Sequence, residues 1–127
     1  MKVRTLTDET FEPEVAAADV AVVVITDEFC DACQEYHRAL QQVADTMDGE
    51  AAFFDVTAQS APQVFASSGV TTWPTTVIFR EGMLLHLESG VYTAENLEQL
   101  VRLFAEADIE EMRQAVTEQG TTVIGAD

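Results

Sequence analysis

Six consecutive apolar residues, Val20-Ala-Val-Val-Val-Ile25, constrain the fold of this chain more than any other segment. The run is rich in β-branched side chains and lacks alternating polar positions, so neither face of the resulting strand suits contact with water. Such a strand, expected over residues 19–26, belongs in the middle of a sheet that is covered on both sides. Directly after it comes Asp27-Glu-Phe-Cys-Asp-Ala-Cys33, and then a helical pattern begins.

The segments around this strand alternate between strand and helix patterns. The helix that includes Cys33 is expected to stop at Gly49, and its apolar residues recur three and four positions apart: Tyr36, Leu40, Val43 and Met47. Further strands are expected at 3–6, 51–56, 75–79 and 84–89, the last two joined as a hairpin by a turn at 80–83. Further helices are expected from Thr10 with Pro13 in the first turn, from Ser60 as N-cap to Gly69, from Thr93 as N-cap, and over 108–119.

This order of elements predicts an α/β fold with three layers. Strands that alternate with helices favour parallel pairing, whereas the hairpin adds antiparallel edge strands. We therefore expect a central mixed β-sheet with helices on both faces, forming one domain at residues 1–107. Residues 108–127 are expected to be an extra C-terminal helix and a tail, packed on or appended to that domain. With 127 residues, 47% of them hydrophobic, the chain can build such a core without disulfide bonds.

The charge balance excludes some functions and indicates a setting. Twenty-three acids against six bases give a formal net charge of −17, which is the wrong sign for binding nucleic acid. The negative charges of such a protein repel one another in ordinary salt, which works against the compact state. At molar salt this repulsion is screened, because the Debye length falls to about 3 Å. The chain therefore resembles proteins of halophiles. An acidic protein of an ordinary cytoplasm, or one steered toward basic partners, is the alternative.

The sequence also bears on location. It has no run of about 18 apolar residues, as a membrane-spanning helix would need. Its first residues lack the apolar stretch of a signal peptide. The resulting expectation is a cytoplasmic protein with no membrane contact.

Cys30 and Cys33 are the two cysteines of the sequence, and they lie three residues apart. A disulfide that closes so short a loop stabilises a fold little, so in a reducing compartment the pair indicates catalysis or metal binding. Cys30 falls where the buried strand meets the helix, near backbone N–H groups and the positive end of the helix dipole, which favour a thiolate. Cys33, one helical turn further on, can then resolve a mixed disulfide formed by Cys30.

Three further motifs accompany the dithiol: Gly69-Val-Thr-Thr-Trp-Pro74-Thr75 before a strand, Phe79-Arg-Glu-Gly82, and Ser89-Gly90 before a helix. With these motifs the chain resembles the thioredoxin family over about residues 10–106. The resemblance implies a thioredoxin-like α/β/α sandwich and a thiol-disulfide oxidoreductase that acts on protein disulfide substrates. It also implies Cys30 as the attacking thiol, Cys33 as the resolving thiol and Pro74 as a cis-proline. A thioredoxin-reductase-type partner is expected to recycle the protein, and no cofactor or metal is expected.

The same resemblance indicates a substrate-binding surface. In the family, the residue before the cis-proline, here Trp73, lends its backbone to the substrate chain. The indole of Trp73 would add flat apolar area there, unless it is an ordinary core aromatic. The candidate substrate-binding residues are Phe29, Asp31, Ala32, Trp73, Pro74, Thr75 and Gly90.

The residues around Cys30 depart from the family's usual Trp-Cys-Gly-Pro-Cys pattern. The chain reads Phe29-Cys-Asp-Ala-Cys33 there, and Asp31 joins Asp27 and Glu28 close to the nucleophile. Like charge disfavours a thiolate, so these acids oppose the helix dipole.

A second departure lies inside the buried strand. Thioredoxins commonly carry a buried carboxylate six residues before the first cysteine, where it helps to deprotonate the resolving thiol. This chain has Val24 at that position. Release of the mixed disulfide is therefore expected to be slow, unless water, Asp27 or Glu28 acts as the base.

Other functions compete with a cytoplasmic reductase. Cys30, Cys33 and His37 form a Cys-x₂-Cys-x₃-His run of metal-binding type, although His86, the other histidine, falls on the expected hairpin. A non-enzymatic adaptor with incidental cysteines is a second alternative. A disulfide oxidant or isomerase is a third, because the reduction potential that separates it from a reductase cannot be calculated from the residues between the cysteines.

Salt is predicted to raise the nucleophilic reactivity of Cys30. Dissolved ions screen the exposed acids beside it, which leaves the helix dipole as the larger influence on the thiolate. The measurement is the rate of thiol alkylation in a series from dilute to molar salt, with a small-molecule thiol as the control. A rate that stays flat or falls relative to that control contradicts the prediction.

Overall fold

Five strands form one mixed sheet in the structure, a computed structural model that describes residues 2–27 and 30–119, with side chains as far as residue 115. They are β1 (Val3–Thr5), β2 (Val20–Ile25), β3 (Ala52–Val56), β4 (Thr75–Arg80) and β5 (Met83–Ser89), in the order β1-β3-β2-β4-β5. β3 pairs in parallel with β1 and β2, whereas β4 runs antiparallel to β2 and β5. The mixed sheet is confirmed. The expectation that both hairpin strands lie at an edge is wrong for β4, because β4 pairs with β2 on one side and β5 on the other, and β5 alone of the two lies at an edge.

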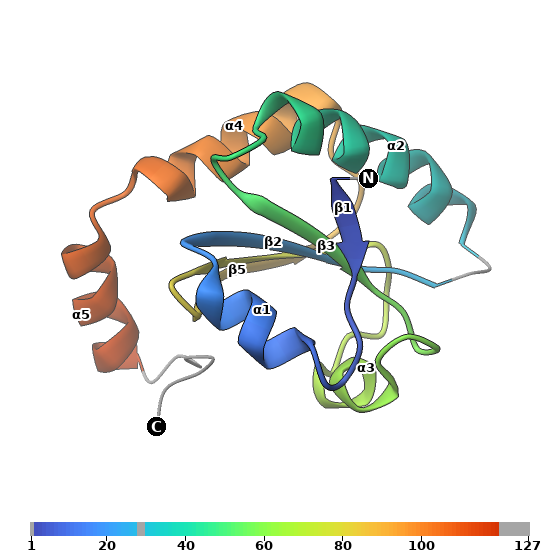
Figure 1. Cartoon of the computed structure of the whole chain (residues 1–127), viewed down its shortest axis with the longest axis horizontal. Helices are drawn as coiled ribbons and strands as arrows, with labels where there is room; N and C mark the ends of the chain where they lie inside the picture. The colour runs from blue at the N-terminus through green and yellow to red at the C-terminus, as the bar shows by residue number, and fades with distance from the viewer. Residues whose placement is uncertain (1, 28–29, 120–127) are drawn as a thin grey trace.

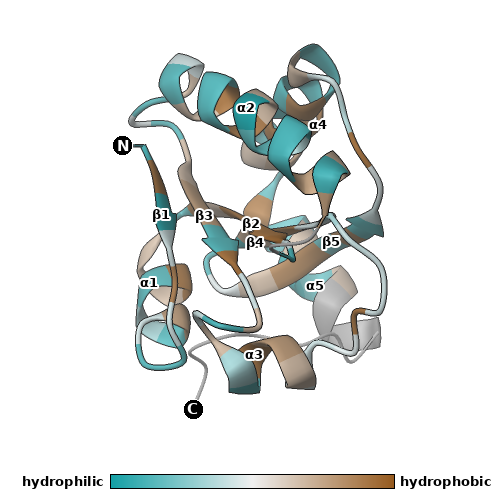
Figure 2. Ribbon diagram, turned by 90° about the vertical axis from the view of Figure 1, so that its right-hand side faces the viewer, coloured by the Kyte–Doolittle hydropathy of each residue, from teal (hydrophilic) through white to brown (hydrophobic). Residues whose placement is uncertain are grey.

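Within the described residues, five helices surround this sheet: α1 (Phe11–Ala17), α2 (Asp31–Thr46), α3 (Pro62–Ser67), α4 (Ala94–Glu106) and α5 (Ile109–Gln119). α2 and α4 cover one face, and α1 and α3 lie on the other (Figures 1 and 2). The three-layer α/β/α sandwich is thus confirmed. Among the helices that the structure describes, none is both long and apolar enough to cross a lipid bilayer.

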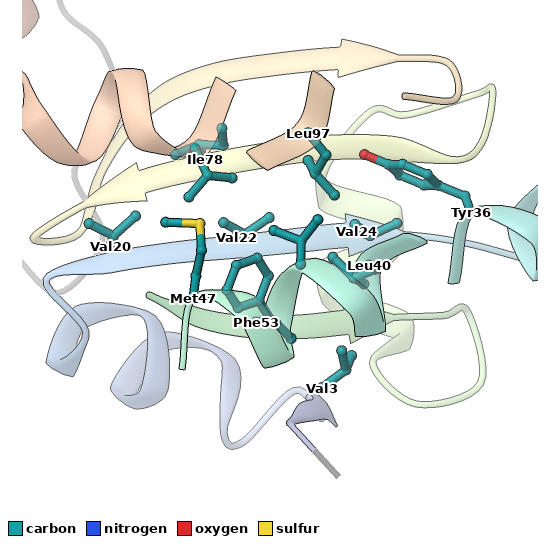
Figure 3. Packing of buried hydrophobic residues seen from close by; sticks show 13 residues of the cluster. Val3, Val20, Val22, Val24, Tyr36, Leu40, Met47, Phe53, Ile78 and Leu97 are labelled. Carbon is teal, nitrogen blue, oxygen red and sulfur yellow. The ribbon is translucent and has the colours of Figure 1, made fainter. Parts of the chain in front are cut away.

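Both layers of helices pack against β2, one layer on each face of the strand. Every side chain of β2 is at most 4% exposed. Val20, Val22 and Val24 point to the α2–α4 face, where they pack in one cluster with Tyr36, Leu40, Met47, Phe53, Ile78 and Leu97 (Figure 3). The alternate residues of β2, Ala21, Val23 and Ile25, pack in a second cluster between the sheet and the helices α1 and α3. Because a fully buried Val or Ile side chain contributes about 1.5–3 kcal/mol, this strand is a main source of stability.

The end of α4 is held by Arg80, a residue that was expected from the sequence to lie in a turn. Arg80 ends β4 and is only 6% exposed. Its Nη1 lies 2.7 Å from the carbonyl oxygen of Phe104 and 3.1 Å from that of Ala107, which are acceptors at the end of α4. A helix leaves its last carbonyls without partners inside the helix, so the guanidinium completes α4 from a neighbouring strand. α5 follows at once and contacts β5; the division into 1–107 and 108–127 stays a prediction.

The predicted N-cap of α3 is wrong. The N-cap position is Ala61, whose side chain cannot accept a hydrogen bond, and Ser60 instead exchanges hydrogen bonds with Thr57 in the preceding turn. Asp8, from the loop after β1, supplies the missing acceptor. Its Oδ1 accepts from the backbone N–H of Gln63 at 3.1 Å and of Val64 at 3.0 Å. A side chain more than fifty residues away therefore caps α3, which no local sequence signal indicates.

Replacing Asp8 with Ala is predicted to lower the free energy of unfolding by about 1 kcal/mol, because two N–H groups of α3 lose their acceptor. The matched control is Glu9→Ala, which removes the same charge from an exposed neighbouring residue. Denaturant unfolding of both variants gives the comparison. Equal unfolding free energies for the two variants would show that Asp8 acts through its charge alone.

Candidate active site

The two cysteines occupy different environments at the start of α2. Cys30 is the N-cap, with an extended backbone, and Cys33 lies in the first turn of the helix; the two are joined by a disulfide bond. The backbone N–H of Cys33 donates to Cys30 Sγ at 3.0 Å. Cys33 is 4% exposed, whereas Cys30 is only partly buried. An incoming molecule can therefore reach Cys30 more easily than Cys33.

The surroundings of Cys30 have opposing effects on its charge once the disulfide is reduced. The N–H group of Cys33 and the helix dipole stabilise a thiolate at the N-cap. Asp31, exposed in the first turn of α2, opposes it with a like charge. Because Asp31 lies in solvent, salt weakens its effect more than that of the hydrogen bond.

The loop before β4 completes the site. The carbonyl oxygen of Trp73 lies 3.8 Å from Cys30 Sγ, and the Trp73–Pro74 peptide bond is cis. The carbonyl of Pro74 accepts from the backbone N–H of Gly90 at 2.9 Å. The hydroxyl of Thr75 donates to the carbonyl of Thr72 at 2.7 Å, and lies 2.8 Å from the hydroxyl of Ser89. Segments on either side of the hairpin thus fix the loop against the dithiol.

The candidate binding residues differ in how much of them a substrate can reach. Asp31 and Ala32 are exposed at the start of α2, and Gly90 is exposed with φ 125°, a conformation that favours glycine. Pro74 and Thr75 are buried. Phe29 and Glu28 lie outside the described residues.

Trp73 is neither a core residue nor a free surface residue. It is partly exposed, and its ring centroid lies 5.7 Å from that of Phe65 on α3. This contact links α3, and through it the cap from Asp8, to the loop that faces Cys30. Phe65 was not among the candidates from sequence, because nothing local in its helix indicates this contact.

The two histidines, considered as metal ligands with the dithiol, are partly exposed and lie on different elements. His37 lies on α2 with Nε2 3.1 Å from Gln41 Nε2. His86, on β5, lies 3.2 Å from the hydroxyl of Tyr92 and packs on Phe104 of α4. Among the described residues, no three His, Cys, Asp or Glu side chains gather as a metal ion requires.

Behind the dithiol, two buried hydroxyls join α2 to β4. Tyr36 and Thr76 are both 0% exposed, and their oxygens lie 2.7 Å apart. Burial raises the pKa of Tyr36 to about 12. The pKa of Tyr92 is also raised to about 12, by burial first and by its hydrogen bond to Glu88 second. From the sequence, Tyr36 was expected only as an apolar residue of a helix; a hydroxyl at a core position was the available signal.

Asp55 was also missed. It is the one charged residue in the apolar run of β3, and its side chain is only 16% exposed. Its Oδ2 lies 3.8 Å from His37 Nδ1, while its Oδ1 is buried with no hydrogen-bond partner. A carboxylate in an otherwise apolar strand was the signal that could have found it.

A hollow of about 500 Å³ lies elsewhere, on the α1–α3 face of the sheet. Its lining is mainly apolar and includes Phe11, Val23, Val64, Phe79 and Leu84. The dithiol is not part of its lining but lies at the start of α2, where the partly exposed Cys30 suits a macromolecular disulfide rather than an enclosed small molecule.

Comparison with known proteins agrees with this geometry. A family model described as thioredoxin matches residues 2–103. Thioredoxin 1 of Nostoc sp. is 28% identical over 95 residues, which cover 74% of this chain and 89% of that protein. The structure of a chloroplastic thioredoxin z matches with a TM-score of 0.76 and 23% identity, over 84% of this chain and 97% of that one. A mutant thioredoxin from Halobacterium salinarum NRC-1 matches with a TM-score of 0.75 and 19% identity, over 84% and 94% of the two chains. Both of these solved structures are similar to this chain in fold.

Both tyrosines are predicted to ionise near pH 12 in the folded protein, rather than near the usual value of about 10. A folded-state pKa above the unfolded one contributes stability that is complete below pH 10 and is lost as the pH rises toward 12. The ultraviolet absorbance of tyrosinate, followed with and without denaturant, gives the two pKa values. Tyr36→Phe should remove one of the two transitions. Tyrosinate that forms near pH 10 in folded protein contradicts the prediction.

Proposed function

This chain belongs to the thioredoxin family and is a thiol-disulfide oxidoreductase, and we propose that it acts as a reductase of protein disulfides. The proposal depends on the asymmetry of the dithiol. Cys30 is partly exposed at a helix N-cap where it accepts the N–H of Cys33, and Cys33 is 4% exposed behind it. That arrangement suits Cys30 to attack and Cys33 to resolve.

The reaction transfers two electrons from the dithiol to the substrate. The thiolate of Cys30 attacks one sulfur of the substrate disulfide, and a mixed disulfide forms as the first substrate thiolate leaves. Cys33 then loses its proton and attacks Cys30 Sγ. The Cys30–Cys33 disulfide forms, the bond to the substrate breaks, and the second substrate sulfur leaves as a thiolate that takes up a proton.

The charges near Cys30 favour reduction over oxidation. A dithiol becomes a strong oxidant when its reduced, thiolate form is stabilised. Here Asp31 lies in the first turn of α2 and opposes the thiolate. Asp31 therefore makes the reduced form less stable, relative to the disulfide, than it would be without this acid, and the pair becomes a better electron donor.

The substrate surface is proposed to consist of the exposed start of α2, with Asp31 and Ala32, together with Trp73 and Gly90, while the buried Pro74 and Thr75 hold the Trp73 backbone in position. The Trp73 carbonyl lies 3.8 Å from Cys30 Sγ, so an extended peptide that pairs with the Trp73 backbone would bring its disulfide to the nucleophile. The partly exposed indole of Trp73 offers an apolar contact beside it.

We further propose a cytoplasmic setting of high salt and recycling by a thioredoxin-reductase-type partner. The excess of 17 acids over bases supports the high-salt setting, because most acids can have no cationic partner and rely on screening by dissolved ions. The exposed pairs, such as that of Lys2 with Asp48, stabilise little by themselves. A catalytic dithiol needs a continuing electron source, which supports the second point.

Cys33→Ser is predicted to stop turnover and to accumulate a mixed disulfide between Cys30 and a disulfide-containing protein substrate. Cys30→Ser, the matched control, should stop turnover without that covalent complex. Non-reducing electrophoresis with mass spectrometry identifies the linked cysteine. A complex that forms through Cys33 contradicts the assignment of the attacking thiol.

The reduction potential of the Cys30–Cys33 pair separates the reductase from its alternatives. A value near −270 mV supports the reductase, and one between about −180 and −120 mV indicates an oxidant or isomerase. Titration in dithiol/disulfide buffers at low and molar salt measures it. Failure of the folded protein to form a reversible disulfide would remove the redox function altogether.

A further inference from the structure

The carboxylate of Asp55 lacks a partner that its burial requires. Oδ1 is buried and accepts no hydrogen bond, and the side chain as a whole is 16% exposed. A buried acceptor left unpaired costs free energy of about 1–3 kcal/mol, and such atoms are rare in folded proteins. The unpaired oxygen therefore makes Asp55 a candidate to accept a hydrogen bond or a proton from a donor brought close to it.

The position of Asp55 places its side chain below the start of α2. Within β3, Asp55 alternates with Phe54 and shares the face of Phe53, which packs in the α2–α4 cluster. In the sheet, Asp55 is the register partner of Val24 on β2. Directly above it, His37 of α2 approaches its Oδ2 at 3.8 Å.

Cys33 lies on the same side of α2, one turn before His37. Residues four apart in a helix share a face, with their Cβ atoms about 5–6 Å apart. Cys33 is also turned inward, at 4% exposure. In the disulfide state described here its sulfur carries no proton, whereas reduction creates a buried S–H donor in this region.

We propose that Asp55 is the proton acceptor for Cys33, acting directly or through one water molecule. In the mixed disulfide, the thiol of Cys33 passes its proton to the Asp55 carboxylate. The resulting thiolate attacks Cys30 Sγ, the Cys30–Cys33 bond forms, and the leaving thiolate departs with the electron pair of the broken bond. Asp55 then returns the proton to the leaving sulfur or to water. His37 positions the carboxylate through its contact with Oδ2.

Among the described residues, the ionisable group in contact with this carboxylate is that of His37. On α2 the facing group is His37, itself held by Gln41, and Tyr36 is engaged with Thr76. The register neighbours of Asp55 are Thr5 on β1 and Val24 on β2. Arg4 lies over the ring of Phe54, which packs on the opposite face of the sheet. Asp31 is exposed in the first turn of α2, where its like charge hinders thiolate formation and so adds to the need for an inner acceptor.

The resolving step can be observed without any protein substrate. Reduced protein is mixed with one equivalent of dipyridyl disulfide, and release of pyridinethione is followed by stopped-flow absorbance. The first thione reports attack by Cys30, and the second reports resolution by Cys33. The inference rests on the dithiol exchange proposed above, but the two fail differently: wild-type protein that releases no second thione would refute the exchange itself.

Asp55→Asn keeps the size of the side chain and removes its basicity. The second rate near neutral pH should fall about tenfold or more, while the first stays within about twofold of wild type. The deficit should shrink as the pH rises and the Cys33 thiol ionises without help. Glu35→Gln is the matched control, because it removes one exposed acid from α2, the helix that carries Cys33.

Three results would overturn the assignment. The first is a second rate in Asp55→Asn equal to that of Glu35→Gln, and the next is an equal fall in both rates, which indicates general distortion. The last is a slow second step in His37→Gln with a normal one in Asp55→Asn, which would make the imidazole the acceptor. The expected result for His37→Gln is a smaller loss than in Asp55→Asn, confined to the second step.

Discussion

The burial of β2 on both faces is the constraint from which the site follows. β2 lies in the middle of the sheet, covered by α2 and α4 on one face and by α1 and α3 on the other, and its C-terminal end lies where the chain leaves the sheet. The chain turns there into α2, and Cys30 becomes the N-cap of that helix. The nucleophile is thereby supplied with a backbone donor from Cys33 and with the helix dipole, neither of which depends on a neighbouring cation.

The opposite side of the site is held by contacts that reach across the chain. Asp8 caps α3, Phe65 of α3 packs on Trp73, and the carbonyl of Trp73 faces Cys30 Sγ. Hydroxyls complete the support: Thr75 is held beside Ser89, and Thr76 is held by Tyr36. The loop before β4 is thus fixed from α3, β5 and α2 together, which limits how far Trp73 can move from the dithiol.

The elements were largely predictable from sequence, because apolar periodicity reports burial directly. The run at 20–25, the spacing of Tyr36 and Leu40, and Thr93 as the N-cap of α4 all appear as expected. What could not be predicted are contacts between polar groups far apart in the chain. Asp8 replaced the expected Ser60 cap, and Asp55 lies below α2, although each is an ordinary acid in a sequence with 23 of them. Local patterns cannot show which acids the fold turns inward.

Arg80 has a consequence for how the molecule tolerates changes in its ionic surroundings. Most of its side chain is withdrawn from solvent, and its guanidinium meets main-chain oxygens at the end of α4 rather than a surface acid alone. Mobile ions weaken exposed pairs readily but reach buried charges poorly. The contacts between the sheet, α4 and α5 are therefore screened little by dissolved ions. Ion pairs on the outer surface of the protein weaken as the ionic strength rises, while the hydrogen bonds of Arg80 keep nearly the same strength in dilute and in concentrated salt.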